Sequence, residues 1–163
     1  MAKELSVGTI LTDGMSILAC QPFSRKAKPG NFDIPKGHWE EGETVLETAL
    51  REMEEETGFY ITHPDQMVDL GLFKYIPTKD LHIFFYAIDA LPEPGTLKCS
   101  TNFEYKGREV PEVIGYRHVD INDLQWFFPS LQRVLSQALD KFAIEADDED
   151  HYDREDIDEP ISS

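Results

Sequence analysis

The feature that most constrains this chain is a glutamate-rich helical stretch that begins near Thr44 and stops at Gly58. Strong helix formers fill the interval, and the two flanking residues are typical of a helix start and a helix stop. At about 100° per residue, several apolar side chains fall on one stripe. These are Leu46, Ala49, Leu50 and Met53. The fold must therefore offer this stripe a core to pack against.

Glu52, Glu55 and Glu56 gather on one flank of the same helix, because they lie three or four residues apart. Like charges at this spacing repel by about 0.2–0.5 kcal/mol per pair in water. Divalent cations remove that penalty, since carboxylate oxygens are the ligands that Mg²⁺ and Mn²⁺ prefer. Taken alone, such a cluster is more often a solvated helix face, with Glu47 and Arg51 as an ordinary ion pair.

Composition limits the classes of protein that need to be considered. A length of 163 residues is sufficient for one domain with a substantial core. No apolar run approaches the roughly 18 residues of a membrane span, and the start has no signal-peptide pattern. We therefore expect a cytoplasmic protein that contacts no membrane. Cys20 and Cys99 match no metal-binding spacing. We expect reduced thiols, with a disulfide between the two as the alternative.

The chain is strongly acidic, with a net charge of −17. Residues 145–163 hold ten acids and one base, which gives −9 and leaves −8 for the rest. This balance argues against general binding of nucleic acid, including duplex DNA, through a basic surface. An acidic protein with a polyanionic substrate needs cations at its site.

Apolar and β-branched runs predict a series of strands separated by turns. They are Leu5–Leu11, Met15–Cys20, Met67–Ile76, Leu81–Ala90 and Val113–Val119. Gln21–Asn31 is predicted to be a basic loop, and Leu91–Gly107 is interpreted as a loop region. Asp120 or Asn122 is expected to cap a short helix that ends near Phe127.

Pro129 is suited to the first position of a longer helix, which we expect to end near Glu145. One apolar stripe of this helix is predicted to pack against the sheet. It consists of Leu131, Val134, Leu135, Ala138 and Phe142. The composition of the acidic tail, residues 145–163, predicts disorder.

Residues 37–59 match every defined position of a longer motif. It reads Gly, five residues, Glu, seven residues, Arg-Glu, an apolar residue, any residue, Glu-Glu, any residue, Gly and an apolar residue. The matching residues are Gly37, Glu43, Arg51, Glu52, Met53, Glu55, Glu56, Gly58 and Phe59. This is the Nudix box, and the chain resembles Nudix hydrolases over most of its length. The resemblance implies an α/β fold, the Nudix α/β/α sandwich with a mixed sheet, over residues 1–144.

The resemblance also implies roles for individual residues. Glu52, Glu55, Glu56 and the carbonyl of Gly37 match metal ligands, and Arg51 with Glu43 matches a pair that braces the loop against the helix. Family members take a further carboxylate from outside the box. We expect Glu112 to supply it, because residues 112–117 resemble the segment that does so in several relatives. The alternative is a surface glutamate at the start of a strand.

The chemistry implied is hydrolysis of a phosphoanhydride with roughly two or three Mg²⁺ or Mn²⁺ ions. We expect the ions to activate water and Glu56 to remove its proton, with Glu55 and Glu112 as rivals for that role. Catalysis is thus expected to depend on Glu56, Glu55 and Arg51.

The substrate is less strongly indicated. Pro35-Lys36-Gly37-His38 and the pair Tyr116-Arg117 resemble asymmetric diadenosine tetraphosphate hydrolases. The expected substrate contacts are Lys36, His38, Arg25, Lys26 and Tyr86. For the aromatic residues of the Phe84-Phe85-Tyr86 run, packing in the core is the default.

We therefore expect a pyrophosphohydrolase that acts on dinucleoside polyphosphates or related nucleoside polyphosphates. An RNA 5′-triphosphate pyrophosphohydrolase is the alternative with the same chemistry. An alternative of another class is a catalytically inactive nucleotide-binding module whose acidic tail recruits a partner.

Overall fold

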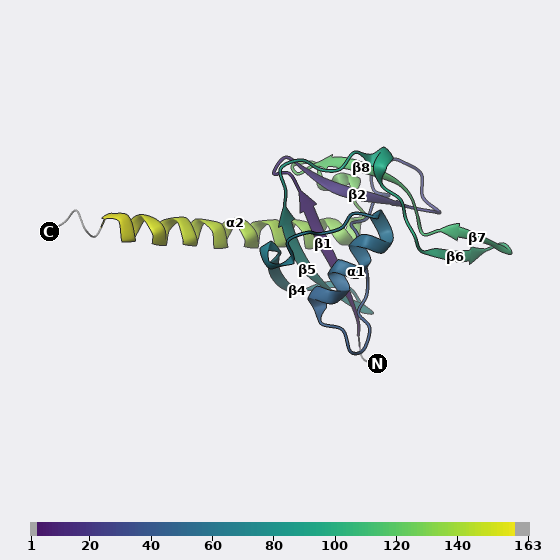
Figure 1. Cartoon of the computed structure of the whole chain (residues 1–163), viewed down its shortest axis with the longest axis horizontal. Helices are drawn as coiled ribbons and strands as arrows, with labels where there is room; N and C mark the ends of the chain where they lie inside the picture. The colour runs from purple at the N-terminus through teal and green to yellow at the C-terminus, as the bar shows by residue number, and fades with distance from the viewer. Residues whose placement is uncertain (1–2, 159–163) are drawn as a thin grey trace.

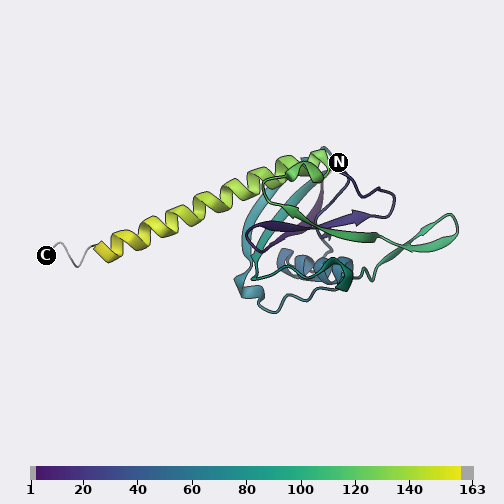
Figure 2. The ribbon, with the colours of Figure 1, turned by 90° about the horizontal axis from the view of Figure 1, so that it is seen from above.

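The computed structural model describes the backbone of residues 3–158 and the side chains as far as residue 148. A mixed sheet lies between two helices, α1 (Val45–Thr57) and α2 (Pro129–Asp158), which cover its opposite faces (Figures 1 and 2). The expected α/β/α sandwich is thus confirmed.

The sheet has the strand order β4-β5-β1-β2-β8, with β3 paired to β1 beside β2. Its centre is the parallel pair β1 and β5, and the other pairs are antiparallel. The strands are β1 (Glu4–Thr12), β2 (Ser16–Pro22), β3 (Lys36–His38), β4 (Val68–Ile76), β5 (Lys79–Ala87) and β8 (Val113–Asp120). All strands predicted from the sequence are present, with shifted ends.

One edge of β1 is shared by two strands, and this division positions the site. β3 pairs with Ser6–Gly8, whereas β2 meets β1 at Thr12. The segment between them re-enters the sheet at Asp33, which pairs with Cys20. The loop before α1 is therefore held on β1, directly beside the helix that follows it.

A second, two-stranded sheet was not predicted. β6 (Asn102–Tyr105) and β7 (Arg108–Pro111) form a hairpin that projects from the body (Figure 1). β6 lies in the region interpreted as a loop, so that interpretation is corrected. Lys106 and Gly107 have φ values of 51° and 78°, as a two-residue type I′ turn requires. Lysine is uncommon at the first of these positions, so the sequence alone did not indicate a turn here.

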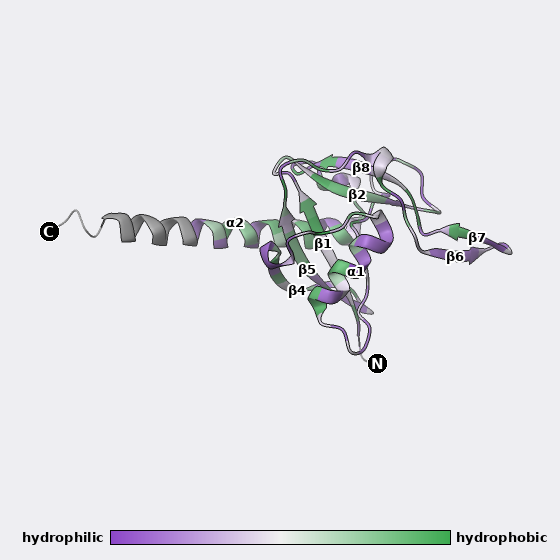
Figure 3. Ribbon diagram, in the orientation of Figure 1, coloured by the Kyte–Doolittle hydropathy of each residue, from purple (hydrophilic) through white to green (hydrophobic). Residues whose placement is uncertain are grey.

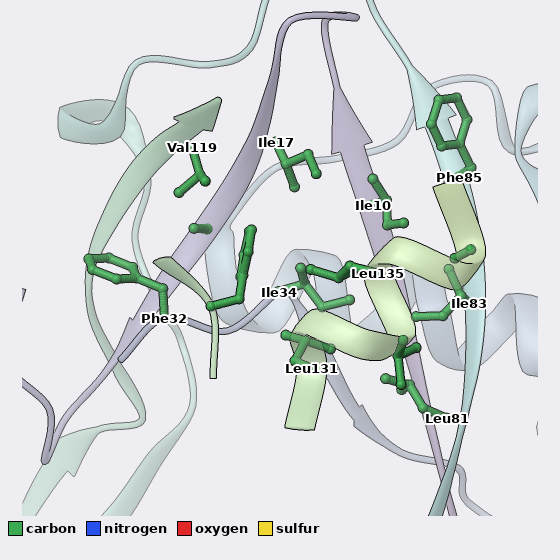
Figure 4. Close-up of a cluster of buried hydrophobic side chains, with 14 of the residues drawn as sticks. Ile10, Ile17, Phe32, Ile34, Leu81, Ile83, Phe85, Val119, Leu131 and Leu135 are labelled. Atoms are coloured by element: carbon green, nitrogen blue, oxygen red, sulfur yellow. The ribbon is translucent and has the colours of Figure 1, made fainter. Parts of the chain in front are cut away.

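The larger core lies between the sheet and α2. Ile10, Ile83, Leu131 and Leu135 are fully buried there (Figure 4). The ring of Phe142 stacks on that of Phe85 with a centroid separation of 3.9 Å. The predicted stripe of α2 therefore packs on the sheet as expected, and β1 and β2 are hydrophobic along most of their length (Figure 3).

The end of α2 differs from the prediction. The helix was expected to stop near Glu145, but its backbone continues as helix to Asp158, so disorder from residue 145 is not confirmed. A helix that is nucleated by a packed segment extends one residue at a time without a new nucleation cost. Residues 159–163 of the predicted tail lie outside the described residues.

Three short 3₁₀ turns complete the described chain: η1 (Pro64–Gln66), η2 (Pro94–Thr96) and η3 (Leu124–Trp126). The short helix predicted before Phe127 is η3, and Asp123, rather than Asp120 or Asn122, occupies its first flanking position. Among residues 3–158, no helix is both long and apolar enough to cross a membrane.

Candidate active site

The helix α1 is fixed at both ends by its own sequence. The Thr44 side chain accepts from the backbone N–H of Glu47, and the Glu47 carboxylate accepts from the N–H of Thr44. This reciprocal capping box satisfies two of the free donors at the helix start. At the other end, Gly58 has a φ of 74°, a left-handed conformation that favours glycine.

The apolar stripe of α1 packs on the sheet as predicted. Ala49 lies against Val7 and Phe84, and Met53 lies against Leu11 and Leu18. This packing sets the rotation of the helix about its axis. It turns Glu52 toward β3, where only 8% of the residue is exposed.

Gly37 and Glu52 meet at the contact between β3 and α1. A Cβ added to Gly37 would lie 2.0 Å from Cδ and 2.1 Å from Oε1 of Glu52. Any side chain at position 37 would therefore occupy the space of the carboxylate. The glycine is needed here for close approach, as its place in the predicted site implies.

Arg51 braces the loop before α1 against the helix. Its Nε donates to Glu43 Oε2 at 2.8 Å, and its Nη2 donates to Glu43 Oε1 at 2.9 Å. The same Nη2 donates to the carbonyl of His38 at 3.0 Å. The bidentate pair fixes the loop geometry, and the Arg51 hydrogen bond lowers the pKa of Glu43 to about 2. These contacts join the loop to the helix, and the bracing role of the pair stays a prediction.

The Glu52 carboxylate is largely shielded from water, and other negative charges lie near it. Burial raises its pKa to about 7, the Arg51 guanidinium opposes that shift, and Glu55 and Glu112 add to it. Arg51 Nη1 donates to Glu52 Oε1 at 2.7 Å and to Glu55 Oε2 at 3.3 Å. The site thus gathers more negative charge than its single arginine balances.

Glu56 is partly buried and is the glutamate of the cluster that the backbone of β3 holds. Its Oε1 accepts from the backbone N–H of Lys36 at 2.9 Å. Burial raises the pKa of Glu56 well above its usual value, and the charges of Asp33 and Glu52 act in the same direction. The Tyr116 hydroxyl donates to the Glu56 carbonyl, which ties β8 to the end of α1.

Glu112 lies at the turn between β7 and β8 and reaches the same region. Its charge contributes to the raised pKa of Glu52, so the two carboxylates are within electrostatic range. Thr101 Oγ1 donates to Glu112 Oε2 at 3.3 Å. Ser100, one residue earlier, donates through its backbone N–H to the carbonyl of Glu55 at 2.7 Å. Glu112 therefore lies within electrostatic range of Glu52, beside the segment that contacts Glu55.

The Lys36 side chain was expected to contact phosphate, but its ammonium group is already paired within the protein. Side chains alternate along a strand, so Lys36 points away from the face on which Gly37 meets Glu52. Its Nζ pairs with Asp33 Oδ2 at 3.0 Å and lies over the Tyr75 ring. The part of Lys36 that reaches the glutamates is its backbone N–H.

The other predicted substrate contacts are dispersed. The half-exposed His38 imidazole faces Glu4, with Nδ1 and Oε2 3.9 Å apart. Arg25 and Lys26 are exposed in the loop after β2, and the Arg25 guanidinium lies over the Phe128 ring. Tyr86 is buried in the core beneath α1, so core packing and not base stacking describes it.

The neighbours of the aromatic run are likewise in the core. Phe84 and Phe85 lie on opposite faces of β5. Phe84 is in the core on the α1 side, and Phe85 is in the core on the α2 side.

Cys20 and Cys99 are unpaired and buried together near Tyr116, in agreement with the expected free thiols.

The donor set fits a divalent cation in its chemistry. Glu52, Glu55, Glu56, Glu112 and the Gly37 carbonyl could supply hard oxygen ligands. The carboxylates of Glu52 and Glu56 have raised pKa values that a nearby cation would lower. Within the described part of the chain, no three acidic, histidine or cysteine side chains converge closely enough to form a finished metal cluster. Arg51 Nη1 holds Glu52 and Glu55, and the Lys36 N–H holds Glu56, so a cation must compete with these donors.

Some residues of the site were missed by sequence reasoning. Asp33 pairs with Lys36, Ser100 and Thr101 hold Glu55 and Glu112, and Thr48 donates to Glu43 Oε1 at 3.0 Å. Thr48 is one turn after Thr44 on a predicted helix, so its position beside Glu43 carried a local signal. Asp33, Ser100 and Thr101 come from other segments of the chain, and no local sequence signal pointed to them.

Comparison with known proteins found matches over most of this chain. Residues 2–139 match the family model described as the NUDIX domain. The chain is 38% identical over 145 residues to the uncharacterized 17.7 kDa protein of the e–segB intergenic region of Enterobacteria phage T4. That alignment covers 84% of this chain and 96% of the phage protein.

Solved structures with low sequence identity share the fold. One is the NUDIX domain of Shewanella oneidensis NrtR, solved with ADP ribose. It has a TM-score of 0.61 and 18% identity, with 87% of this chain and 90% of that chain covered. Another is a Caenorhabditis elegans Ap4A hydrolase binary complex, with a TM-score of 0.55 and 15% identity. In that comparison 87% of this chain and 98% of that chain are covered.

Proposed function

Because this chain belongs to the Nudix family, whose members hydrolyse pyrophosphate bonds, we propose that it is a divalent-metal-dependent pyrophosphohydrolase of dinucleoside polyphosphates or related nucleoside polyphosphates. The observation that carries the proposal is the closure of the loop before α1 onto the helix. Gly37 lies against Glu52, and Arg51 clamps Glu43. This closure presents the acidic flank of α1 as one preorganised surface.

Mg²⁺ or Mn²⁺ would be held by Glu52, Glu55, Glu56, Glu112 and the Gly37 carbonyl. When bound, such ions neutralise phosphate charge, lower the pKa of a water molecule and stabilise the leaving phosphate. The residues of the chain then orient these components. Arg51 keeps the loop and helix in register, and the Lys36 N–H keeps Glu56 in place.

Glu56 is our candidate for the general base. A base must accept a proton in the reaction, and a carboxylate whose pKa is raised by burial has a higher affinity for one. Its fixed side chain also limits the reorganisation required. Glu55 and Glu112 are the competing candidates, because both carboxylates lie at the same surface.

The proposed substrate rests on the segment that enters the site. Pro35-Lys36-Gly37-His38 resembles that of asymmetric diadenosine tetraphosphate hydrolases, and the fold is shared with an Ap4A hydrolase. The loop after β2 contributes Arg25, Lys26 and Lys28, which are exposed cations suited to a long phosphate chain.

A substrate panel tests the proposal. The protein is incubated with Mg²⁺ or Mn²⁺ and diadenosine tetraphosphate, nucleoside triphosphates, ADP-ribose or 5′-triphosphorylated RNA, and the products are separated. We expect cleavage of diadenosine tetraphosphate at the highest kcat/KM and loss of activity in Glu56→Gln. Glu41→Gln, a change at an exposed glutamate in the loop, is the matched control and should retain activity.

Two other outcomes would redirect the proposal. Preferential release of diphosphate from 5′-triphosphorylated RNA would favour an RNA pyrophosphohydrolase, for which the Glu112 to Arg117 segment also provides a resemblance. Hydrolysis of no substrate, with Glu56→Gln indistinguishable from the wild type, would favour an inactive nucleotide-binding module.

A further inference from the structure

The β6–β7 hairpin carries aromatic side chains that neither core uses. Phe103 and Tyr105 are two residues apart on β6 and therefore share one face. Phe23, from the loop after β2, meets both rings edge-on, with centroid separations of 5.6 Å and 5.2 Å. Even so, Phe103 is 38% exposed and Tyr105 is 40% exposed. We call Phe23, Phe103 and Tyr105 the aromatic arm.

The aromatic arm is attached to the glutamate site at both ends of the hairpin. Ahead of β6, Ser100 donates to the carbonyl of Glu55. After β7 comes Glu112, whose carbonyl accepts from the backbone N–H of Phe23 at 3.0 Å. The base of the hairpin is therefore tied to the acidic surface through Ser100 and Glu112, and the hairpin projects outward from there (Figure 1).

The loop on one side of the aromatic arm is basic, in contrast to the chain as a whole, whereas the hairpin itself carries Lys106 and Arg108 against Glu104 and Glu109. The loop Gln21–Asn31, which contains Phe23, has three basic residues and no acidic residue, whereas the whole chain has a net charge of −17. At the hairpin turn, the Lys106 ammonium lies 5.3 Å from the centroid of the Tyr105 ring. Flat, partly open rings next to cations are complementary to a base joined to phosphates.

We propose that the aromatic arm stacks on the distal base of a dinucleoside polyphosphate whose phosphate chain runs along the basic loop to the glutamates. This inference rests on the proposed function and specifies its substrate as one with a second base. A second copy of this chain is a poorer occupant, because it would bring the same large negative charge to a small hairpin.

The test replaces both exposed rings of the hairpin, in the variant Phe103→Leu/Tyr105→Leu. Leucine keeps apolar contact with Phe23 but has no flat face for a base. Tyr60→Leu is the matched control, because Tyr60 is 69% exposed, follows the end of α1 and makes none of the ring contacts of the aromatic arm. The kcat and KM are measured for diadenosine tetraphosphate and ATP with Mg²⁺. Binding of both is measured by calorimetry in the Glu56→Gln background.

The double variant should bind diadenosine tetraphosphate about tenfold more weakly, equivalent to about 1.4 kcal/mol, with a matching rise in KM. Its kcat, and its affinity for ATP, should stay within about twofold of the parent protein, since neither needs a distal base. Tyr60→Leu should change neither substrate's binding.

Other results would overturn the inference. Unchanged affinity for the dinucleotide would show that the rings bind no base. An equal loss for ATP and the dinucleotide, with a lower kcat, would show that the hairpin only positions Glu112. A loss confined to 5′-triphosphorylated RNA would assign the arm to RNA. If the wild type hydrolyses nothing, the proposed function fails, but the calorimetric comparison still decides whether the arm binds the second base.

Discussion

At the scale of single residues, the site depends on how one arginine distributes its donors. Arg51 binds Glu43 on the loop and, through Nη1, both Glu52 and Glu55 on the helix. A planar guanidinium can satisfy several carboxylates in fixed directions, which lysine cannot do. Arg51 thereby holds together a cluster of like charges that would otherwise repel.

Gly37→Ala should displace the Glu52 carboxylate, because the new Cβ would lie 2.0 Å from its Cδ. Changes that misplace a metal ligand typically cost about 10–100-fold in metal affinity or activity. We expect a loss of that size in Mn²⁺ affinity by calorimetry and in kcat/KM. Gly95→Ala is the control, since nothing lies within 4 Å of its added Cβ. Equal behaviour of the two variants would contradict the close contact.

The ion pair between Glu43 and Arg51 should make the free energy of unfolding depend on pH in the acidic range. Arg51 lowers the pKa of Glu43 to about 2 in the folded chain, whereas an unfolded glutamate titrates near roughly 4.3. The unfolded state thus binds the proton more tightly. The stabilisation is present above the unfolded pKa and is lost as pH falls through that window toward about 2.

Urea unfolding at pH 6 and pH 3 measures this dependence. Glu43→Gln should lose less unfolding free energy between the two pH values than the wild type, because glutamine does not titrate. Glu41→Gln, whose side chain is exposed, should follow the wild type. A wild-type slope in Glu43→Gln would rule out the pair as its source.

At the scale of elements, α1 is defined by local chemistry at both of its ends. Thr44 closes a capping box with Glu47, and Gly58 ends the helix. Thr44→Ala should lower the unfolding free energy by about 1 kcal/mol, because a backbone donor loses its partner. Chemical denaturation measures the change, with Thr62→Ala as an exposed control. A Thr44→Ala protein as stable as this control would show that the cap contributes little.

At the scale of the whole molecule, α2 has a docked part and an extension. Lys141 Nζ donates to the carbonyl of Leu70 at 2.6 Å, and Phe142 stacks on Phe85. These are the contacts of the docked part nearest to Glu145. The acidic residues after Glu145 continue the same helix, whose first part is anchored to the sheet.

A chain that ends after Glu145 should therefore keep turnover within about tenfold, since the docked contacts remain. A chain that ends after Gln137 loses Ala138, Lys141 and Phe142 and should unfold at a clearly lower temperature. Thermal unfolding and steady-state kinetics on both truncations test this division. A loss above about tenfold in the longer one would show that the extension takes part in activity.

The sequence by itself determined the elements that depend on short-range order. The bounds of α1, its apolar stripe and the flank of Glu52, Glu55 and Glu56 follow from helical periodicity, and β1, β2, β4, β5 and β8 follow from apolar runs. The pattern over residues 37–59 also indicated the family, because its chemistry requires those residues at fixed spacing.

Only the tertiary structure decided which distant segments meet and how water is excluded where they do. The contact of Gly37 with Glu52, the pairing of Lys36 with Asp33 and the burial of Tyr86 depend on how β3, β5 and α1 pack. The hairpin behind Glu112 depends on a Lys106-Gly107 turn with little local signal. Desolvation, which raises the pKa values of Glu52 and Glu56, exists only once those layers close.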